Sequence, residues 1–266
     1  MYCLAIDDSL KNKIKELNYI PVGLGNYKFS EEWLRDNTGE NISNKNSYYG
    51  EYTFHYWLWK NQLNQIPENT WIGFCAYRRF WSKTISKPKK IIKFEKEIIQ
   101  TVDDRWKNYD VILGDKIDLT HIKWIKVLKY GKISFLRNPY VIFKSKRNIR
   151  FHFDMFHGNG YLDKAINLLS EKDREDFRNF TINNSSYNQG NMFITKSKSI
   201  MKRYYEEVFD WLEKCESIFG FDLHGHEKTR IYGFLAERFL PYWFNKYTKV
   251  FEWPILFYDF KKENEN

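Results

Sequence analysis

The first 25 residues alternate between apolar and polar segments in a way that predicts strand, helix and strand. Met1–Ile6 is a short apolar run, Asp8–Leu17 carries apolar residues at helical spacing, and Asn18–Gly25 is a second apolar segment that ends in a Gly-rich turn. A β-α-β opening of this kind indicates an α/β fold in which helices cover a sheet.

Further along the chain, the same two periodicities predict more buried elements. The expected helices are Glu51–Asn61, Leu162–Leu169, Ser199–Ile218 and Thr229–Tyr247, and the expected strands are Thr70–Cys75, Asp110–Leu113 and Asn191–Thr195. Pro241 must begin a new helix or bend the last one, because proline lacks the backbone N–H of a helix interior. With no internal repeat and no low-complexity linker, we expect one domain over residues 1–260 and a polar tail over 261–266.

Charge changes this picture in one segment. The chain carries a formal charge of +9, and residues 116–150 alone hold ten Lys or Arg against one acid, Asp118. In Thr120–Lys129 the lysines 123, 126 and 129 recur every three residues beside an apolar stripe, which predicts an amphipathic helix. Residues 116–150 therefore read as a basic amphipathic insertion, either a contact with an anionic membrane surface or an ordinary solvated helical hairpin.

Composition bounds the class of protein and its compartment. Aromatic residues make up 19% of the chain, a surplus that suits stacking on sugars or nucleobases but also follows from a codon bias toward Phe and Tyr. Cys3, Cys75 and Cys215 are widely spaced, with no CxxC pair. No run approaches the roughly 18 apolar residues of a membrane span. We expect a cytoplasmic protein with reduced thiols, located in the cytosol or at the inner face of the membrane.

Most signatures of catalysis are missing, including the P-loop, GxGxxG, HExxH and GxSxG. His224 and His226 form an HxH pair. Because no third ligand lies near it in the sequence, this pair is weak evidence for a metal site. A D-x-D motif, the usual metal site of nucleotide-sugar transferases, is also absent. The expected strand Thr70–Cys75 is followed instead by Tyr77, Arg78 and Arg79. Guanidinium groups bind phosphate oxygens bidentately, so this pair either replaces the metal or forms structural ion pairs.

Five blocks of sequence together resemble one known family. They are Asp36–Asn61, Ile72–Phe80, Tyr109–Leu113, Asn191–Ile194 and Arg230–Phe239. In this order they resemble the bacterial capsule and O-antigen glycosyltransferases long catalogued as a domain of unknown function, DUF4422, some of which transfer galactofuranose. This chain departs from the family in having Ala76 where His is frequent, and in the length of its basic segment.

The resemblance implies a GT-A-like nucleotide-binding fold, with a central mixed sheet flanked by helices and a basic helical insertion. It implies a nucleoside-diphosphate sugar as donor, with UDP and galactofuranose as first choices, and a surface glycan or lipid-linked glycan as acceptor. Glu51 and the aromatic run Tyr56–Asn61 would support the donor pocket, with core packing as the alternative for Trp57 and Trp59. We expect the donor to contact Asp7, Gly23, Gly25, Asn41, Lys45, Tyr77, Arg78, Arg79, Asn188, Asn191 and Arg230.

An inverting transferase also needs a base that deprotonates the acceptor hydroxyl. Our first candidates are His157, Asp110 and Glu237; Asp115, Asp154 and Glu227 are further ones. His157 is expected in a glycine-containing loop, Asp110 could equally cap a strand, and Glu237 could equally pair with a neighbouring Arg.

The sequence leaves three alternatives to a metal-independent transferase. A nucleic-acid-binding protein is disfavoured, because the basic residues are confined to one segment and no nucleic-acid motif occurs. A non-catalytic glycan-binding protein would keep the fold and lack turnover. No metal cofactor is expected, and the alternative is a transferase that holds Mn²⁺ or Mg²⁺ through acids that the sequence does not pair.

Overall fold

The computed structural model describes residues 1–88, 91, 93–122, 136, 139–143 and 146–260. The chain divides into two compact units. The first contains Met1–Asp115, Gly190–Tyr205 and Phe244–Asn266, and the second contains Lys116–Gln189 and Glu206–Trp243. The range 1–260, which we expected to form one domain, is therefore shared by two units, and the first boundary falls where the basic segment begins.

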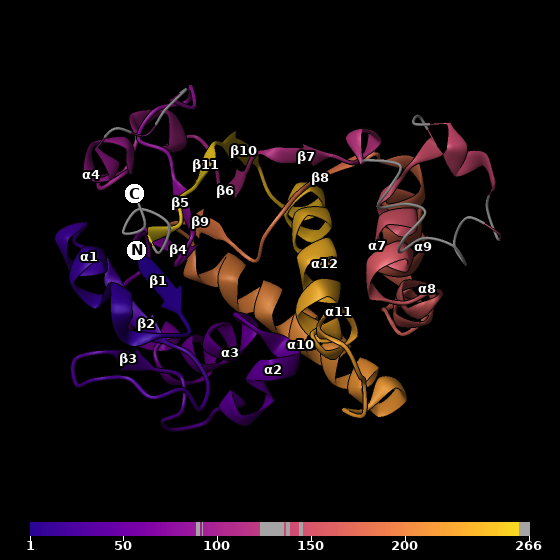
Figure 1. The fold of residues 1–266 in the computed structure, drawn as a ribbon, viewed down its shortest axis with the longest axis horizontal. Coiled ribbons are helices and arrows are strands. Elements are labelled where there is room, and N and C mark those ends of the chain that lie inside the picture. Colours follow the sequence, from indigo (N-terminus) through magenta and orange to yellow (C-terminus); the bar gives the residue numbers. More distant parts are fainter. Residues whose placement is uncertain (89–90, 92, 123–135, 137–138, 144–145, 261–266) are drawn as a thin grey trace. The chain divides into compact units, whose positions relative to one another are not determined.

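A nine-stranded mixed sheet forms the centre of the first unit (Figure 1). Its strands are β1 (Tyr2–Ala5), β2 (Ile20–Gly23), β3 (Leu34–Arg35), β4 (Ile72–Ala76), β5 (Arg79–Trp81), β6 (Val111–Gly114), β9 (Phe193–Thr195), β10 (Val250–Trp253) and β11 (Ile255–Phe257). The order is β10-β6-β9-β4-β1-β2-β3, while β5 pairs with β4 and β11 pairs with β5. The predicted β-α-β opening is confirmed, because β1 and β2 are parallel neighbours.

The directions of the strands decide which loops meet. β1 is parallel to β2 and β4, and β10 is parallel to β6. β9 runs antiparallel to both β4 and β6, so those two share one direction and β9 begins where they end. The loops after β1, β2, β4 and β6 and the loop before β9 therefore share one edge of the sheet, here called the carboxyl edge.

Short helices accompany this sheet in the first unit. They are α1 (Lys11–Glu16), α2 (Asn46–Tyr49), α3 (Tyr52–Asn61) and α4 (Phe94–Glu97). α3 is the predicted aromatic helix, and Tyr52, Phe54, Trp57 and Leu58 are buried on it. Apolar side chains of α3 and the sheet pack directly, as in the Tyr2–Phe54 ring contact at 5.1 Å.

The second unit is mainly helical. It contains α7 (Ile149–His157), α8 (Tyr161–Ile166), α9 (Glu171–Asn183) and α11 (His226–Thr229), with a two-stranded antiparallel sheet of β7 (Lys116–Asp118) and β8 (Ser186–Asn188). The long helices α10 (Lys198–Phe219) and α12 (Ile231–Tyr247) contribute residues to both units. A core in this unit joins Leu119, Ile149 and Tyr187.

The structure decides two sequence-based predictions about helices. α12 continues through Pro241, so no new helix begins there, and of the two predicted alternatives only a bend in the helix is left. The other prediction is wrong. His157 does not lie in a loop, because it is the last residue of α7, which begins at the N-cap Asn148. The glycines that suggested a loop follow the helix instead, and Gly158 ends it with φ of 110°.

Two other predictions fall largely outside the described residues. The amphipathic helix expected over 120–129 is described only as far as Ile122, and the tail 261–266 lies wholly outside. Within the described part of the chain, the helices are all too short or too polar to cross a bilayer.

Candidate functional site

The carboxyl edge gathers most of the predicted donor-binding residues of the first unit. Asp7 follows β1, Gly25 follows β2 and Tyr77 follows β4, and two backbone bonds extend the ladders, from Leu24 N to Ala5 O and from Tyr77 N to Leu4 O, each 3.0 Å. Asn191 precedes β9 and so joins the same edge. In open α/β sheets this edge is where ligands bind.

The loop after β2 is held in one conformation by two neighbouring side chains. The Arg35 guanidinium donates to the carbonyl oxygens of Gly23 (3.1 Å), Gly25 (2.7 Å) and Tyr27 (3.0 Å). The Asp36 carboxylate, fully buried, accepts from Gly25 N at 2.8 Å and from the Thr53 hydroxyl. Gly25 has φ of 59°, and a Cβ there would meet Asn46 Cβ at 2.8 Å. The loop therefore needs glycine and presents its backbone in a fixed form.

We expect Asp36→Ala to lower the free energy of unfolding by about 2–4 kcal/mol, because it leaves a buried N–H and a buried hydroxyl without their acceptor. Burial also raises the pKa of Asp36, so the neutral isostere Asp36→Asn should cost much less. Urea unfolding of both variants measures the difference. Equal losses for Ala and Asn would contradict the role of Asp36 as a hydrogen-bond acceptor.

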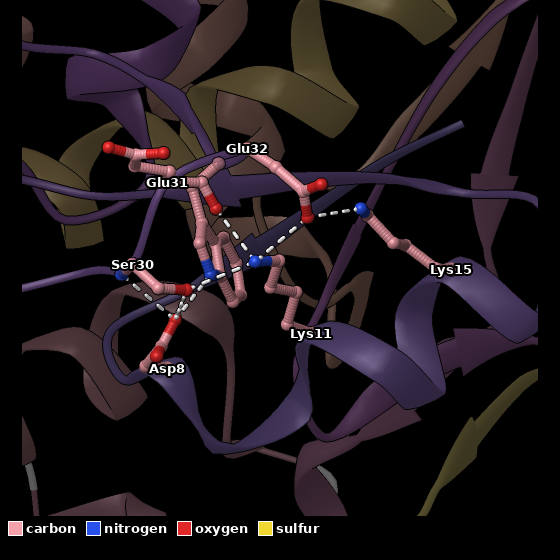
Figure 2. A network of polar contacts seen from close by, with 7 residues as sticks. Asp8, Lys11, Lys15, Ser30, Glu31 and Glu32 are labelled. Carbon is pink, nitrogen blue, oxygen red and sulfur yellow. Dashed lines mark hydrogen bonds and ion pairs between the residues drawn. The ribbon is translucent and has the colours of Figure 1, made fainter.

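A polar network ties the rest of this loop to the first helix, as Figure 2 shows. Asp8 accepts from Ser30 N at 3.2 Å and from the Ser30 hydroxyl at 2.8 Å, while Lys11 donates to Glu31 O at 2.7 Å. Glu32 lies between Lys15 at 2.7 Å and Lys11 at 2.9 Å, and these two ammonium groups lower its pKa to about 2. The network fixes the segment that follows the Gly25 turn.

The two adjacent arginines do not share a strand. Tyr77 and Arg78 form the tight turn between β4 and β5, and Arg79 is the first residue of β5, opposite Ala76. The two arginines therefore do not alternate along one strand, because Arg78 belongs to the turn and Arg79 to β5. The two arginines nevertheless differ in their surroundings.

Arg78 is occupied by protein groups. Its guanidinium lies 3.5 Å from the Asp259 carboxylate, donates to the Tyr77 hydroxyl at 2.9 Å and stacks over the Tyr77 ring at 4.8 Å. Asp259 neutralises its charge locally. Arg78 thus matches the structural alternative, an ion pair that holds the turn.

Arg79 is half-buried, and among the described residues its guanidinium has no hydrogen-bond acceptor and no acidic partner. The group lies beside Gly190, where a Cβ would stand 3.6 Å from Arg79 Nη1. Gly190 has φ of 95°, a conformation that side chains disfavour. A guanidinium without a carboxylate at the carboxyl edge is suited to an anionic ligand.

Two other predicted donor contacts lie on the polar segment before α3. Asn41 accepts from Ser43 N at 3.2 Å and from its hydroxyl at 2.7 Å, which makes it a turn-forming residue. Lys45 immediately precedes Asn46, the residue that lies against Gly25, and its ammonium is 6.0 Å from the Tyr49 ring. α3 supports this segment, because the Trp57 indole donates to Thr38 O at 2.8 Å and Asn61 donates to Glu40 O at 2.8 Å.

His55, which the sequence analysis did not consider, connects α3 to the loop before β9. Its Nδ1 lies 2.8 Å from the Tyr205 hydroxyl and its Nε2 lies 3.2 Å from Asn191 O. The ring packs on Phe74 at 4.3 Å and is fully buried. Burial lowers the pKa of His55 to about 4, so the ring is neutral near pH 7 and positions the Asn191 backbone.

A carboxylate from our wider set of candidates also lies at the carboxyl edge. Asp115 follows β6, accepts from Ile255 N at 2.9 Å and pairs with Lys87 at 2.5 Å. Its side chain is 39% exposed. Asp110, by contrast, precedes β6 at the opposite edge and accepts from Lys249 N at 2.8 Å. Asp110 caps the β6–β10 ladder there and is not brought together with the donor-binding candidates of the first unit.

Two of the first catalytic candidates meet in the second unit around a buried arginine. Glu237 forms an ion pair with Arg238, and Arg238 Nη2 lies 3.3 Å from His157 Nε2 and 3.1 Å from His152 Nδ1. A guanidinium only donates, so the His157 Nε2 lone pair accepts this bond. His157 also stacks on Phe234 at 3.8 Å. These contacts agree with the ion-pair alternative for Glu237 and direct the Nε2 lone pair of His157 toward Arg238.

The remaining candidates belong to the second unit as well. Asn188 is the last residue of β8 and is buried, and the Arg230 guanidinium is 6.0 Å from the Phe234 ring. Asp154 accepts from Gly160 N at 3.0 Å and so shapes the turn between α7 and α8. Glu227 and His226 lie on α11, and their side chains are outside the described set.

Sequence reasoning missed several residues of the carboxyl edge. Arg35 and His55 act through contacts with backbone atoms that are distant in the sequence, which no local pattern reveals. Asp259 and the strand β11 were missed because Ile255–Phe257 is too short to give a periodic signal. Within the described ranges, no group of three or more His, Cys, Asp or Glu side chains is arranged to hold a metal ion.

The fold defines an α/β protein with an open mixed sheet, and the carboxyl edge of this sheet carries Arg79 without an acidic partner among the described residues. The chain belongs to the family described as Domain of unknown function (DUF4422), whose model matches residues 8–249. The predicted family is confirmed. No similar sequence was found among curated proteins.

One solved structure shares the fold. The chain is similar to the WbbM bifunctional glycosyltransferase in its apo form, with a TM-score of 0.67 and 21% sequence identity. The similarity covers 97% of this chain and 45% of that chain, so this chain spans less than half the length of the protein it matches. The predicted α/β fold with a central mixed sheet flanked by helices is confirmed.

Proposed function

We propose that this protein is a glycosyltransferase that transfers a sugar from a nucleoside-diphosphate donor, with UDP as the first choice, to a glycan or lipid-linked glycan acceptor. The observation that carries the proposal is the Arg79 guanidinium, which lies at the carboxyl edge without an acidic partner among the described residues. The fold that the chain shares with WbbM, described as a bifunctional glycosyltransferase, supports the same class of reaction.

The donor would extend along the carboxyl edge. Its nucleoside would lie at the ends of β1 and β2, where the fixed Gly25 loop presents backbone groups and where Ile6 and Tyr27 are 37% and 52% exposed. Its diphosphate would bind Arg79, beside the Gly190 backbone. A fixed cation stabilises the leaving diphosphate as its charge develops, which is the role a metal has in other transferases.

We propose Asp115 as the base that deprotonates the acceptor hydroxyl, in preference to His157, Asp110 and Glu237. Asp115 is exposed at the carboxyl edge, and the bond from Ile255 N fixes its orientation. In this reaction the acceptor oxygen forms a bond to the anomeric carbon, the bond to the diphosphate breaks, and the acceptor proton passes to the carboxylate. We propose galactofuranose as the transferred sugar on the basis of the family resemblance alone.

Location is likewise a proposal. Nucleotide sugars suggest a cytoplasmic enzyme, and residues 116–150 would contact the inner face of the membrane. Within that range the described Leu136, Tyr140 and Phe143 are 79%, 68% and 61% exposed, as suits side chains that enter a lipid interface.

A thermal-shift screen tests the proposed function. The protein is melted with UDP, GDP, CMP and dTDP, each with Mn²⁺ or with EDTA, because a ligand of the native state raises the melting temperature. We expect a shift with one nucleotide that survives EDTA. A shift that requires Mn²⁺ would favour the metal-dependent alternative, and no shift with any nucleotide would favour a non-catalytic glycan-binding protein.

We expect Asp115→Asn to lower turnover at least about 100-fold, the usual effect of removing a general base, while nucleotide affinity stays unchanged. Donor hydrolysis and transfer to an acceptor extract measure turnover. Asp110→Asn is the matched comparison, because it removes a carboxylate from the opposite end of the same strand. Loss of activity in Asp110→Asn with retention in Asp115→Asn would reverse the assignment.

A further inference from the structure

Phe257 is a large apolar side chain that the fold leaves open to solvent at the carboxyl edge. It is the last residue of β11 and is 62% exposed. The two preceding residue pairs of the β11–β5 ladder are mostly covered, since Leu256, Phe80 and Trp81 are all buried. The ladder thus leaves the core at its final pair, which joins Phe257 to Arg79.

The register determines where the ring lies. Residues directly opposite in an antiparallel pair have Cβ atoms about 4.5–5.5 Å apart and project on the same face. Phe257 and Arg79 form such a pair, so their side chains leave the sheet on the same face at directly opposite positions. The described part of the chain therefore places an exposed aromatic residue and a cationic residue opposite each other on one face of this edge.

The segment after Phe257 is fixed by its own contacts. Tyr258 N donates to Arg78 O at 3.0 Å, and the Tyr258 ring stacks on Phe94 at 4.5 Å. Asp259 pairs with Arg78 at 3.5 Å. These bonds hold the end of β11 against the Tyr77–Arg78 turn, so the backbone that carries Phe257 has a defined position.

The order of the strands indicates which part of a donor reaches the ring. β1 and β2, where the nucleoside would lie, are on one side of β4, and β9 and β6 are on the other. With its diphosphate on Arg79, a donor that begins at β1 and β2 has its sugar beyond β4, near Gly190 and Phe257. Apolar C–H faces of sugars stack on aromatic rings, whereas the diphosphate of a bare nucleotide has no such face.

We infer that Phe257 is the ring on which the transferred sugar of the donor lies, and that it makes the enzyme bind the sugar conjugate more tightly than the bare nucleotide. This inference rests on the proposed function. Phe257 lies outside residues 8–249, the part of the chain that the family model matches, so it is a feature of this chain's C-terminal segment.

The test compares affinities for a nucleotide and for its sugar conjugate. Isothermal titration uses UDP with UDP-galactose, GDP with GDP-mannose, and dTDP with dTDP-glucose, on wild type, Phe257→Ala, Phe257→Tyr and Phe143→Ala. Phe143 is the matched control, since its ring is 61% exposed and belongs to the second unit. Melting without ligand should be the same for all four proteins, because both rings are on the surface.

We expect one conjugate to bind wild type more tightly than its nucleotide, and Phe257→Ala to reduce this advantage about 5- to 10-fold with nucleotide affinity unchanged, as one aromatic contact warrants. Phe257→Tyr and Phe143→Ala should keep the advantage. An advantage retained in Phe257→Ala, or absent in wild type, overturns the inference and leaves the proposed function standing. Failure of wild type to bind any of the nucleotides removes the proposed function and the inference with it.

Discussion

Replacing Arg79 with alanine is expected to weaken binding of the nucleoside diphosphate about 30- to 100-fold, while the free energy of unfolding changes little. The expected loss corresponds to one charge-assisted, bidentate contact with phosphate. Stability should be retained because the guanidinium makes no ion pair with the described residues. Titration calorimetry measures the affinity, and urea unfolding measures the stability.

Arg78→Ala is the matched comparison, because it removes the same charge one residue earlier. Arg78 pairs with Asp259 and packs on Tyr77, so its loss should lower stability by about 1 kcal/mol or less, as for other exposed ion pairs, and should weaken nucleotide binding only a few-fold. Equally mild effects of both substitutions would remove the Arg79 phosphate site. A larger affinity loss in Arg78→Ala would transfer that role to the turn.

The second large effect concerns stability and pH. His55 has a pKa of about 4 in the folded protein, because burial disfavours its charged form, and a pKa of about 6.5 when unfolded. Between these values the unfolded chain binds more protons than the folded one, so stability falls as the pH is lowered from about 6.5 to about 4. The full loss from this residue is about 3 kcal/mol, since one pKa unit is worth about 1.4 kcal/mol.

Urea unfolding between pH 4 and pH 7 checks this expectation. At pH 7, His55→Gln should be less stable than wild type, because the contacts with Tyr205 and Asn191 are weakened. The difference should shrink as the pH falls, since wild type then pays to keep His55 neutral and the variant does not. His224→Gln, at a histidine whose side chain is 90% exposed, is the surface control and should change the free energy of unfolding little. A pH-independent difference for His55→Gln would contradict a buried neutral histidine.

Residue type alone does not identify the catalytic base of this protein. His157 and Glu237 have the right chemistry for proton transfer, but the fold joins them to Arg238, where their polar atoms have protein partners. Asp110 and Asp115 lie at opposite ends of the same strand. Only the direction of β6 separates a strand cap at one edge of the sheet from a partly exposed carboxylate at the other. Direction in a sheet depends on pairing with distant strands, which sequence patterns do not contain.

The sequence by itself determined the local elements and the family. The short apolar run before Asp7, the spacing in Asp8–Leu17 and the aromatic segment of α3 have the periods of a strand and of two helices, and the structure contains each of them. These elements can be predicted from the sequence because side-chain burial repeats with the period of the backbone. The Arg78–Arg79 pair predicts phosphate binding from the charge and geometry of guanidinium groups, a prediction that the nucleotide titrations test.

Only the tertiary structure decided which arginine is available, which carboxylate is exposed and which ring stands beside them. Asp259 reaches Arg78 across 181 positions of sequence, and β11 brings Phe257 to Arg79 through a three-residue strand. His55 and Asp36 act through bonds to backbone atoms of Asn191 and Gly25. Such contacts depend on how distant segments pack. This packing leaves no periodic pattern in the sequence, so it cannot be predicted from the sequence alone.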